Sequence, residues 1–311
     1  NDNINKTSSL FGIINNTSTA IGKRLLKERL LNPIKDITEL NKRYDYIEEF
    51  LRENNEGYIY QQIEENLSNI RDLERLHRKL SLLMLEPYQF VSLDIGYSLI
   101  IKIINYVRDK CSVVSQLLPS QKCMDQFNNF LNEYRNDFDM DEINKYNLNN
   151  ITKSFFKKGR EPAIDKIQDE LDECFSFMDA LKKRLSDLLE KDSNFVKLTR
   201  TDKDGYYFSA TYKRSDTLKK KLKNMCNKSL KIKVGNKIIK IKPNNISFSK
   251  RKKSECIIEA NIIEKYTNKV YKLTENIKHI VKEAFLNKLK LYDSKYISSL
   301  KDIVRFISEI D

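Results

Sequence analysis

Apolar residues recur every three or four positions through much of the first half of the chain, a spacing typical of helices with one buried face. The pattern predicts a helix within residues 17–32, and Pro33 should end it because the residue before a proline disfavours helical geometry. We expect the buried face of this helix to consist of Ile21, Leu25, Leu26 and Leu30.

A second helix is predicted over residues 36–51, where Asp36 and Glu39 have the spacing of a capping box. Its predicted buried stripe is Ile37, Leu40, Tyr44, Ile47 and Leu51. This regular spacing favours a helix that packs against a neighbour along its whole length.

The helical pattern continues from residue 59 to Pro87 and becomes more apolar over residues 90–107, as in a central packed helix. Residues 135–160 are polar and rich in Asn, which predicts a connector with a short helix. Charged residues on these helices are expected to face solvent. They include Glu48, Glu49, Glu64, Glu65 and His77.

Two later segments have heptad spacing, in which apolar residues alternate at intervals of three and four. The first, between Pro162 and Asp192, is formed by Ile164, Ile167, Leu171, Cys174, Met178, Leu181, Leu185 and Leu188. The second is formed by Ile263, Tyr266, Val270, Leu273, Ile277, Ile280 and Ala284. We expect the two helices to pair antiparallel, as a stalk that carries the intervening residues at its tip.

Residues 193–257, between the heptad segments, are predicted to be rich in β-structure. Strands are expected within residues 194–200, 206–212 and 244–253, and a short helix within residues 217–225. Of Tyr206 and Tyr207, at most one is expected to be free to stack on a base, because alternation along a strand should bury one of the two.

Residues 230–242 are predicted to form an amphipathic hairpin around Gly235-Asn236, a pair suited to a type II′ turn. On one face this turn pairs Val234 with Lys237, Ile232 with Ile239 and Leu230 with Ile241. On the other face it pairs Lys233 with Ile238 and Lys231 with Lys240, and Lys242 lies beyond. Directly opposed lysines repel each other, so this face is expected to bind an anion.

The positive charge is concentrated in one segment. The chain has a net charge of +13, whereas residues 195–253 alone contain 19 Lys+Arg and 3 Asp+Glu, a net charge of +16. A polyanion is therefore the predicted partner. The richness in Lys, Asn and Ile suggests an AT-rich genome and a viral or organellar lineage, with a nuclear origin left open.

Motifs of enzymes and metal sites are missing from the sequence. It contains no P-loop, dinucleotide fingerprint or zinc spacing, and only two distant histidines. Residues 139–142 are expected to form a polar loop rather than a cation site. Five scattered cysteines indicate free thiols in a reducing, intracellular compartment. We therefore expect no catalytic residue, metal, cofactor or membrane partner in this chain.

Several motifs resemble the core, or lever, domain of the MutS family of DNA mismatch repair proteins. The family's T-x-x-G-x-R-x-L motif, proline break and N-x-R fall on Thr19, Gly22, Arg24, Leu26, Pro33, Asn41 and Arg43. Residues 70–80 are similar to its D-L-E-R-L helix, and residues 156–171 to the start of its second lever helix. Residues 205–207 resemble the strand that opens its clamp domain, and residues 305–311 the return towards its ATPase domain.

The resemblance implies a mainly α fold with a small β insertion, in which two long antiparallel helices of a helical lever domain carry a β-rich clamp. The lever would comprise residues 1–192 and 258–311, and the clamp residues 193–257. The family's mismatch-reading and nucleotide-binding domains are missing, so we expect part of a longer polypeptide that alone neither hydrolyses ATP nor recognises mismatches. By resemblance, the parent protein would bind ATP and Mg²⁺ and would dimerise around double-stranded DNA.

The family's clamp contacts the DNA backbone without reading sequence, so the basic residues of this segment are the predicted contacts. They are Arg200, Lys213, Arg214, Lys219, Lys220, Lys221, Lys231, Lys233, Lys237, Lys240, Lys242, Lys250, Arg251, Lys252 and Lys253. Arg24, Arg43 and Arg75 are expected to connect lever helices instead.

Three alternatives stay open at this stage. The chain fits an RNA-binding coiled-coil arm, a scaffold whose basic tip meets an acidic protein, or a MutS paralogue that acts on recombination junctions. Residues 249–253 also fit a nuclear-localisation patch.

Overall fold

The computed structural model describes residues 9–54, 57–191, 193–201, 205–225, 229–235, 237–252 and 254–311. These residues are mainly helical with small antiparallel sheets, which confirms the mainly α fold class. Packing divides the chain into two compact units. Unit 1 consists of Asn1–Asn150, Phe155–Lys157 and Glu283–Asp311, and unit 2 consists of Ile151–Ser154 and Lys158–Lys282.

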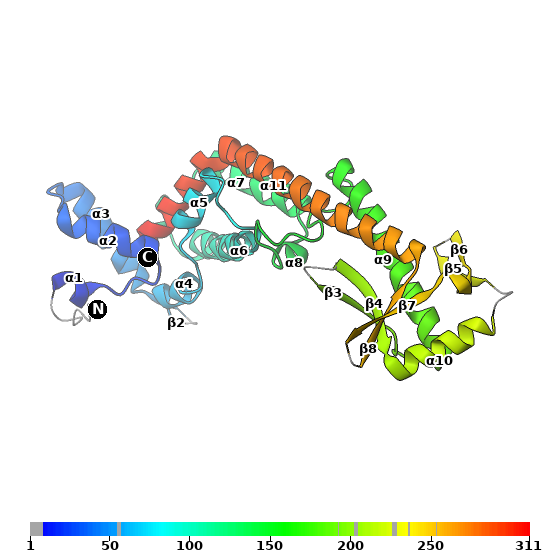
Figure 1. Ribbon diagram of the computed structural model, residues 1–311. Coiled ribbons are helices and arrows are strands. Elements are labelled where there is room, and N and C mark those ends of the chain that lie inside the picture. The colour runs from blue at the N-terminus through cyan, green and yellow to red at the C-terminus, as the bar shows by residue number, and fades with distance from the viewer. Residues whose placement is uncertain are drawn as a thin grey trace. The chain divides into compact units, whose positions relative to one another are not determined.

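Unit 1 is helical, with one two-stranded sheet (Figure 1). Its elements are α1 (Leu10–Ile14), α2 (Ala20–Leu31), α3 (Ile37–Phe50), β1 (Glu53–Asn54), β2 (Gly57–Tyr58), α4 (Ile59–Leu67), α5 (Leu73–Ser81), α6 (Pro87–Lys110), the 3-10 turn η2 (Val114–Leu117), α7 (Gln121–Asp137), α8 (Met140–Ile143) and the last part of α11 (Asn261–Ile310). As predicted, α2 stops before Pro33 and Asp36 caps α3, accepting hydrogen bonds from the backbone N–H of Thr38 and Glu39.

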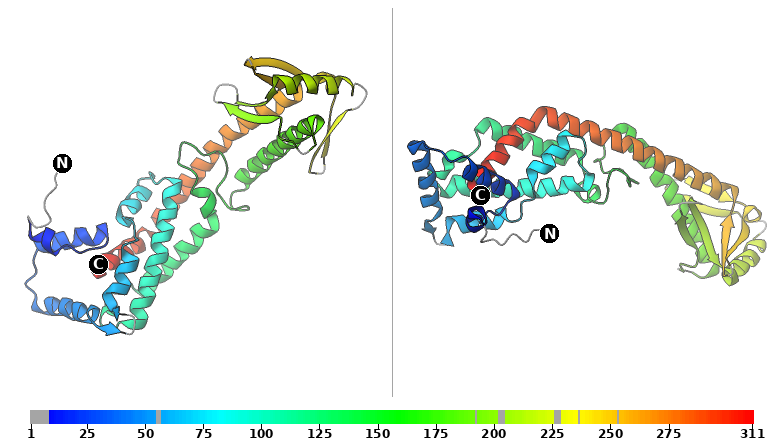
Figure 2. Two further views of the ribbon diagram at one scale, coloured as in Figure 1. Left: turned by 90° about the horizontal axis from the view of Figure 1, so that it is seen from below. Right: turned by 60° about the vertical axis from the view of Figure 1, so that its left-hand side comes forward.

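Aromatic side chains form the centre of unit 1, where α6, α7 and the end of α11 lie side by side (Figure 2). Phe90 of α6 packs edge-on against Tyr134 of α7 at 5.0 Å between ring centroids, and Phe130 of α7 meets Tyr292 of α11 at 5.5 Å. All four residues are fully buried. Helix α6 is long and apolar enough to cross a membrane, but its packing is that of the central core helix predicted for this segment.

The connector after α7 is mostly polar, but it also contains aromatic residues that pack in the protein interior. Phe138, Phe155 and Phe156 are buried and pack against one another, with ring centroids 5.1–6.0 Å apart. Short helix α8 lies within this connector, as predicted. These three aromatic residues of the segment therefore belong to a buried core, although most residues of the segment are polar.

Three predictions about burial in unit 1 are wrong. Each was made from the residues of a single helix, without knowledge of the elements that pack against it. The stripe of α3 is largely exposed, with Ile37 73% and Ile47 53% exposed. His77 is 5% exposed and Glu49 only 1%. Both polar side chains find partners in other helices or turns, and so they tolerate burial.

Arg24 connects two parts of unit 1, as expected. It extends from α2 to Asp72 and Glu74 at the start of α5, with contacts of 2.7 and 2.8 Å. Arg43 instead pairs within α3, with Glu39. Arg24 donates to both carboxylate oxygens of Asp72, and this bidentate geometry makes its contact the more specific of the two.

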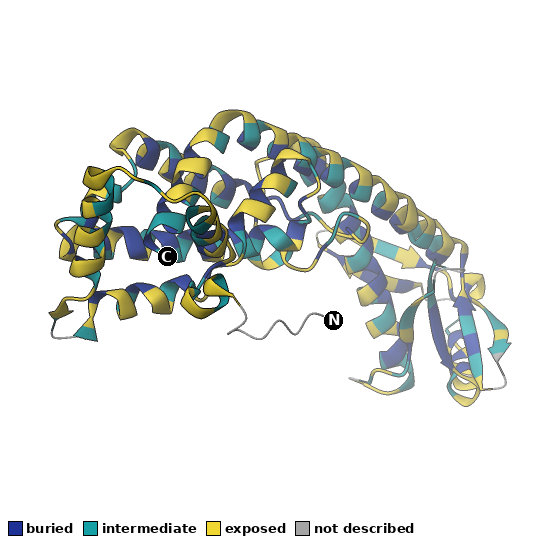
Figure 3. Cartoon of the chain, turned by 90° about the vertical axis from the view of Figure 1, so that its left-hand side faces the viewer, coloured by how far each residue is buried: buried dark blue, intermediate teal, exposed yellow. Residues whose placement is uncertain are grey.

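Unit 2 combines two long helices with a four-stranded sheet and a separate hairpin (Figure 1). Its elements are α9 (Pro162–Leu189), β3 (Lys197–Thr201), β4 (Gly205–Thr211), α10 (Tyr212–Lys223), β5 (Leu230–Val234), β6 (Lys237–Ile241), the 3-10 turn η3 (Pro243–Asn245), β7 (Ser247–Lys252), β8 (Glu255–Glu259) and the first part of α11. Figure 3 shows both buried and less buried positions along its strands. The two kinds alternate in β5 and β8 but not in β4.

The four-stranded sheet has the order β3-β4-β8-β7, with every neighbouring pair antiparallel. Phe208 of β4 and Ile258 of β8 are 0% and 1% exposed and belong to the core of unit 2. The sequence pattern does not predict β8, since its five residues begin and end with glutamate. The structure places it in the middle of the sheet, and its last two residues lie beyond the position 257 at which the clamp is expected to end.

Helices α9 and α11 run antiparallel in unit 2. Phe177 stacks on Tyr266 at 3.9 Å between ring centroids, and Glu170 pairs with Lys269 at 3.0 Å. The seam of α9 is buried at Leu171, Cys174, Met178, Leu181 and Leu185, as predicted. In α11 the buried positions move to Val281 and Phe285 instead of Ile280 and Ala284, because a straight helix drifts from a strict heptad repeat.

Candidate nucleic-acid interface

The hairpin of strands β5 and β6 has the register predicted from its turn. The pairs are Leu230–Ile241, Lys231–Lys240, Ile232–Ile239, Lys233–Ile238 and Val234–Lys237. Gly235 has a φ of +55°, the left-handed value that a primed turn requires at its first central residue. Asn236 lies outside the described residues. The predicted separation of lysines from apolar residues is therefore confirmed.

The apolar face of the hairpin is buried in the core of unit 2. Leu230 and Ile232 are 0% and 1% exposed, and they share that core with Leu181 of α9 and Leu218 of α10. A shift of one residue in register would turn this apolar set to solvent. Because the apolar face of the hairpin is buried, the side chains of its opposite face point to solvent.

We call the opposite side of the hairpin the lysine face; it consists of Lys231, Lys233, Ile238, Lys240 and Lys242. All five side chains are exposed. None of the four lysines has an ion-pair or hydrogen-bond partner among the residues that the structure describes. Lys231 and Lys240 are directly opposite each other, a repulsive arrangement that an anion between them would relieve.

Lys237 belongs to the other side of the hairpin and has a partner. Its ammonium group lies 2.7 Å from Glu173 of α9, and this hydrogen bond raises the pKa of Lys237 and lowers the pKa of Glu173. The pair fastens the hairpin to α9. Lys237 thus has an acidic partner and lies away from the lysine face.

Helix α10 carries several of the predicted cations, and most of them have partners. Arg214 stacks on Phe195 at 3.6 Å from the ring centroid, and Lys219 lies 5.3 Å above Phe248. Lys220 pairs with Asp216 at 3.0 Å. Lys221 donates a hydrogen bond of 3.1 Å to the carbonyl oxygen of Leu189, and so caps the end of α9. Lys213 is exposed and has no such partner among the described residues.

The edge strands of the sheet carry the remaining candidates. Arg200 of β3 lies 5.6 Å above Tyr206, and Arg251 of β7 lies 4.1 Å above Tyr207. Both tyrosines are half-buried, so the expectation that alternation would bury one of them is wrong. Each ring instead has an arginine on one face, a cation–π arrangement. Tyr206 also packs edge-on against Phe175 at 5.4 Å.

The structure divides the predicted contacts into two groups. Six are exposed, without a partner among the described residues, and face solvent: Lys213, Lys231, Lys233, Lys240, Lys242 and Lys250. Seven pack against aromatic rings, acids or a carbonyl of the fold: Arg200, Arg214, Lys219, Lys220, Lys221, Lys237 and Arg251. Lys252 closes β7, but its side chain is outside the description, as is all of Lys253.

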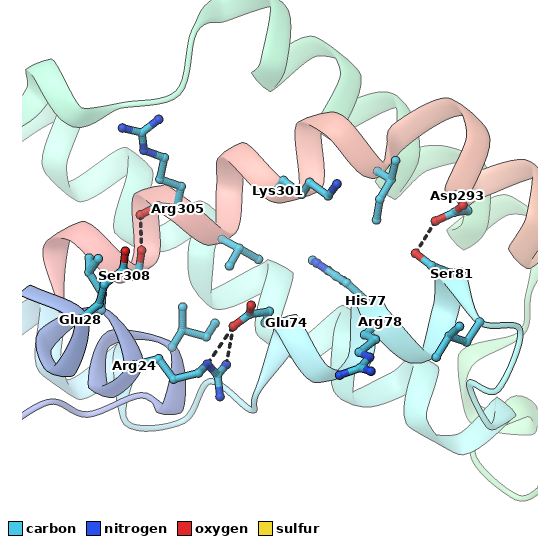
Figure 4. A pocket seen from close by; sticks show the side chains of 15 residues that line it. Arg24, Glu28, Glu74, His77, Arg78, Ser81, Asp293, Lys301, Arg305 and Ser308 are labelled. Carbon is cyan, nitrogen blue, oxygen red and sulfur yellow. Dashed lines mark hydrogen bonds and ion pairs between the residues drawn. The ribbon is translucent and has the colours of Figure 1, made fainter. Parts of the chain in front are cut away.

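A pocket in unit 1 is a second candidate site. It has a volume of about 820 Å³ and lies between α2, α5 and α11. Figure 4 shows that Arg78 and Arg305 extend in different directions, that Arg24 pairs with Glu74 and that Ser81 bonds to Asp293. The charges therefore do not converge on one point, as a phosphate or carboxylate site would require.

His77 lines the same pocket but is neutral at physiological pH. Burial lowers its pKa to about 4, and its Nε2 forms a hydrogen bond of 2.7 Å with the hydroxyl group of Tyr97. Its role is that of a satisfied core histidine.

Acidic residues form no cation site in the part of the chain that the structure covers. Asp139 caps α8, accepting from the backbone N–H of Asp141 and Glu142. Glu142 accepts hydrogen bonds from Lys145 and Tyr146. The carboxylates of Asp139 and Glu142 thus bond to groups of neighbouring residues in the chain.

Comparison with known proteins identifies the family to which this chain is similar. A protein-family model described as MutS domain III matches residues 1–311. A DNA mismatch repair protein mutS homolog of Acanthamoeba polyphaga mimivirus is 32% identical over 98% of this chain and 28% of its own length. A mitochondrial DNA mismatch repair protein mutS homolog of Sarcophyton glaucum is 26% identical over 98% of this chain and 29% of its own length.

A bacterial relative also covers nearly the whole chain, at lower identity. The DNA mismatch repair protein MutS of Borrelia garinii subsp. bavariensis is 22% identical over 97% of this chain and 34% of its own length. The chain thus spans about a third or less of the length of these relatives. MutS domain III is a non-catalytic domain of mismatch repair proteins. Matched over its whole length by that domain, the chain belongs to the MutS family of DNA mismatch repair proteins.

Proposed function

We propose that this chain grips the backbone of duplex DNA through the lysine face, without reading the base sequence. The observation that carries the proposal is that four exposed lysines on one face of the hairpin lack a partner among the described residues. Phosphates are the chemistry that such a face recognises, and DNA presents them at regular spacing. The names of the relatives, which are DNA mismatch repair proteins, support DNA as the polyanion.

In this proposal the long helices act as a lever and residues 193–257 as a clamp, with residues 1–192 and 258–311 as lever. The lever would link the DNA clamp to an ATPase domain of the longer protein, which would bind ATP and Mg²⁺. A dimer of the longer protein would close around the DNA. The described cysteines, Cys111, Cys123, Cys174 and Cys256, are buried free thiols, which fits a reducing compartment.

The test is the dependence of DNA affinity on salt. On duplex DNA, log K should fall with log salt by about 0.9 for each phosphate contact, so four lysine contacts give a slope near −4. Binding of the chain to several mixed-sequence duplexes is measured between 50 and 300 mM salt, about the range over which such contacts are resolved. A flat response, or a strong preference for one sequence, contradicts the proposal.

A charge-reversal variant tests whether the hairpin makes the DNA contact. Replacing Lys231, Lys233, Lys240 and Lys242 by Glu should abolish DNA binding while helical circular dichroism and melting temperature stay unchanged, since none of the four contributes to the core. The matched control replaces the exposed lysines Lys27, Lys35, Lys110 and Lys122 of unit 1 by Glu and should retain binding. Unchanged affinity of the hairpin variant rules out the lysine face.

Competition separates the proposal from its alternatives. Double-stranded RNA that displaces the DNA duplex at lower concentration than DNA itself would favour an RNA-binding arm. A four-way junction that does so would favour a paralogue acting on recombination junctions.

A further inference from the structure

One residue of the lysine face is not a lysine. Ile238 is 61% exposed, although its strand offers buried positions that Ile241 occupies. It lies directly opposite Lys233, and Lys240 follows two residues later on the same strand and side. Lys231 is its diagonal neighbour across the hairpin. The apolar side chain thus has lysines on three sides and the turn on the fourth.

The spacing of this group suits a particular part of a nucleic acid. Side chains directly opposite on a hairpin are about 5 Å apart at Cβ, and diagonal ones about 7 Å. This spacing would let the ammonium groups around Ile238 bind neighbouring phosphates of one strand, with the isoleucine between them. What lies between two phosphates of DNA is a deoxyribose, whose C–H edge is apolar.

We propose that Ile238 packs against the deoxyribose of the strand whose phosphates the surrounding lysines bind. The contact rests on the proposed function and adds a non-electrostatic component to it. It makes the lysine face selective for DNA over polyanions that lack a sugar. It remains independent of base sequence, because every nucleotide presents the same sugar.

The test compares two ligands, a mixed-sequence DNA duplex and inorganic polyphosphate, across a range of salt concentrations. The variant is Ile238→Thr in the full chain, since threonine keeps the β-branched shape that favours a strand but removes apolar surface. DNA affinity should fall about fivefold at every salt concentration, a fraction of the effect of fully burying an isoleucine. The salt slope and the affinity for polyphosphate should not change.

Two further variants serve as controls. Lys233→Gln should weaken binding to both ligands and reduce the slope on DNA by about 0.9. Tyr271→Thr removes a side chain of α11 that is 60% exposed, and it should leave binding to both ligands unchanged.

The outcomes are distinct. If Ile238→Thr binds DNA as tightly as the unmodified chain, or loses polyphosphate binding to the same extent as DNA binding, the sugar contact is overturned while the lysine grip stands. If the unmodified chain does not bind DNA in a salt-dependent manner, the proposed function itself fails and the sugar contact fails with it.

Discussion

Glu49 is buried although its neighbours along α3, Glu48 and Ile47, are exposed. Its carboxylate accepts hydrogen bonds from the backbone N–H groups of Ser112, Val113 and Val114, at 2.7, 2.9 and 2.6 Å, and from the Ser112 hydroxyl at 2.9 Å. These donors open the turn η2, so a side chain from α3 caps it. Burial alone would raise the pKa of Glu49, but the hydrogen bonds outweigh it and lower the pKa below its ordinary value of 4.5.

Replacing Glu49 by Gln should destabilise the chain by about 2 kcal/mol at neutral pH, because an amide cannot accept at both of its polar atoms. A carboxylate whose pKa is lowered on folding stabilises the fold above its unfolded value and loses that contribution as pH falls through the folded value. The difference between the two proteins should therefore shrink as the pH drops below about 4.5. Urea unfolding at several pH values measures it.

The neighbouring Glu48 is the control, since it is exposed on the same helix. Glu48→Gln should change the free energy of unfolding by less than about 0.5 kcal/mol. Equal effects of the two substitutions would show that the capping of η2 does not contribute to stability.

At the scale of elements, the start of α2 is fastened to the end of α11. Thr19 caps α2 by accepting from the Gly22 N–H at 2.9 Å. The carboxylate of Asp311 accepts from the backbone N–H groups of Ser18 and Thr19, at 2.7 and 2.9 Å, and from the Thr19 hydroxyl at 2.6 Å. An acid at a helix N-terminus also complements the helix dipole.

Gly22 is required by this contact. A Cβ at position 22 would lie 2.0 Å from Asp311 Oδ2. Gly22→Ala should therefore destabilise the chain by about 1–2 kcal/mol, although Ala in a helix normally stabilises by about 1 kcal/mol relative to Gly. Chemical unfolding monitored at the helical circular dichroism band measures the change.

A double-mutant cycle isolates the cause. In an Asp311→Gly background the three clashing side-chain atoms of Asp311, which lie 2.0–2.7 Å from the added Cβ, are absent, so Gly22→Ala should become neutral or stabilising. If the substitution is equally harmful in both backgrounds, the close approach to Asp311 is not the reason for glycine at this position.

At the scale of the whole molecule, the excess charge belongs to unit 2. Residues 195–253 have a net charge of +16, within a chain whose net charge is +13. Lys231, Lys233, Lys240 and Lys242 have no acidic partner among the described residues, so their mutual repulsion opposes folding of that part of the chain. The aromatic partners of Arg200, Arg214, Lys219 and Arg251 offset part of the cost elsewhere in unit 2.

Added salt should therefore protect the hairpin. Raising NaCl from about 50 to 300 mM shortens the screening length from roughly 14 to 6 Å, and backbone amides of β5 and β6 should exchange hydrogen more slowly. Amides of α6 and α7, helices that carry both acidic and basic residues, should be unaffected. Hydrogen exchange followed by mass spectrometry tests this, and faster exchange of the hairpin at higher salt would contradict it.

The sequence by itself determined the features that depend on close neighbours along the chain. Helix periodicity, the stop before Pro33, the cap at Asp36, and the register of the hairpin around Gly235 all follow from residues a few positions apart. The lysine face could be predicted for the same reason, because a known turn and a period of two assign every side chain to a face.

Only the tertiary structure decided which predicted faces are buried and which cations are engaged. Lys237 meets Glu173 across 64 residues, Lys221 meets the Leu189 carbonyl across 32, and Glu49 reaches Val114 across 65. The stripe of α3 stays exposed, while Glu49 on another side of that helix is its buried anchor. Such pairings depend on where distant segments meet in space, which neither periodicity nor charge along the chain encodes.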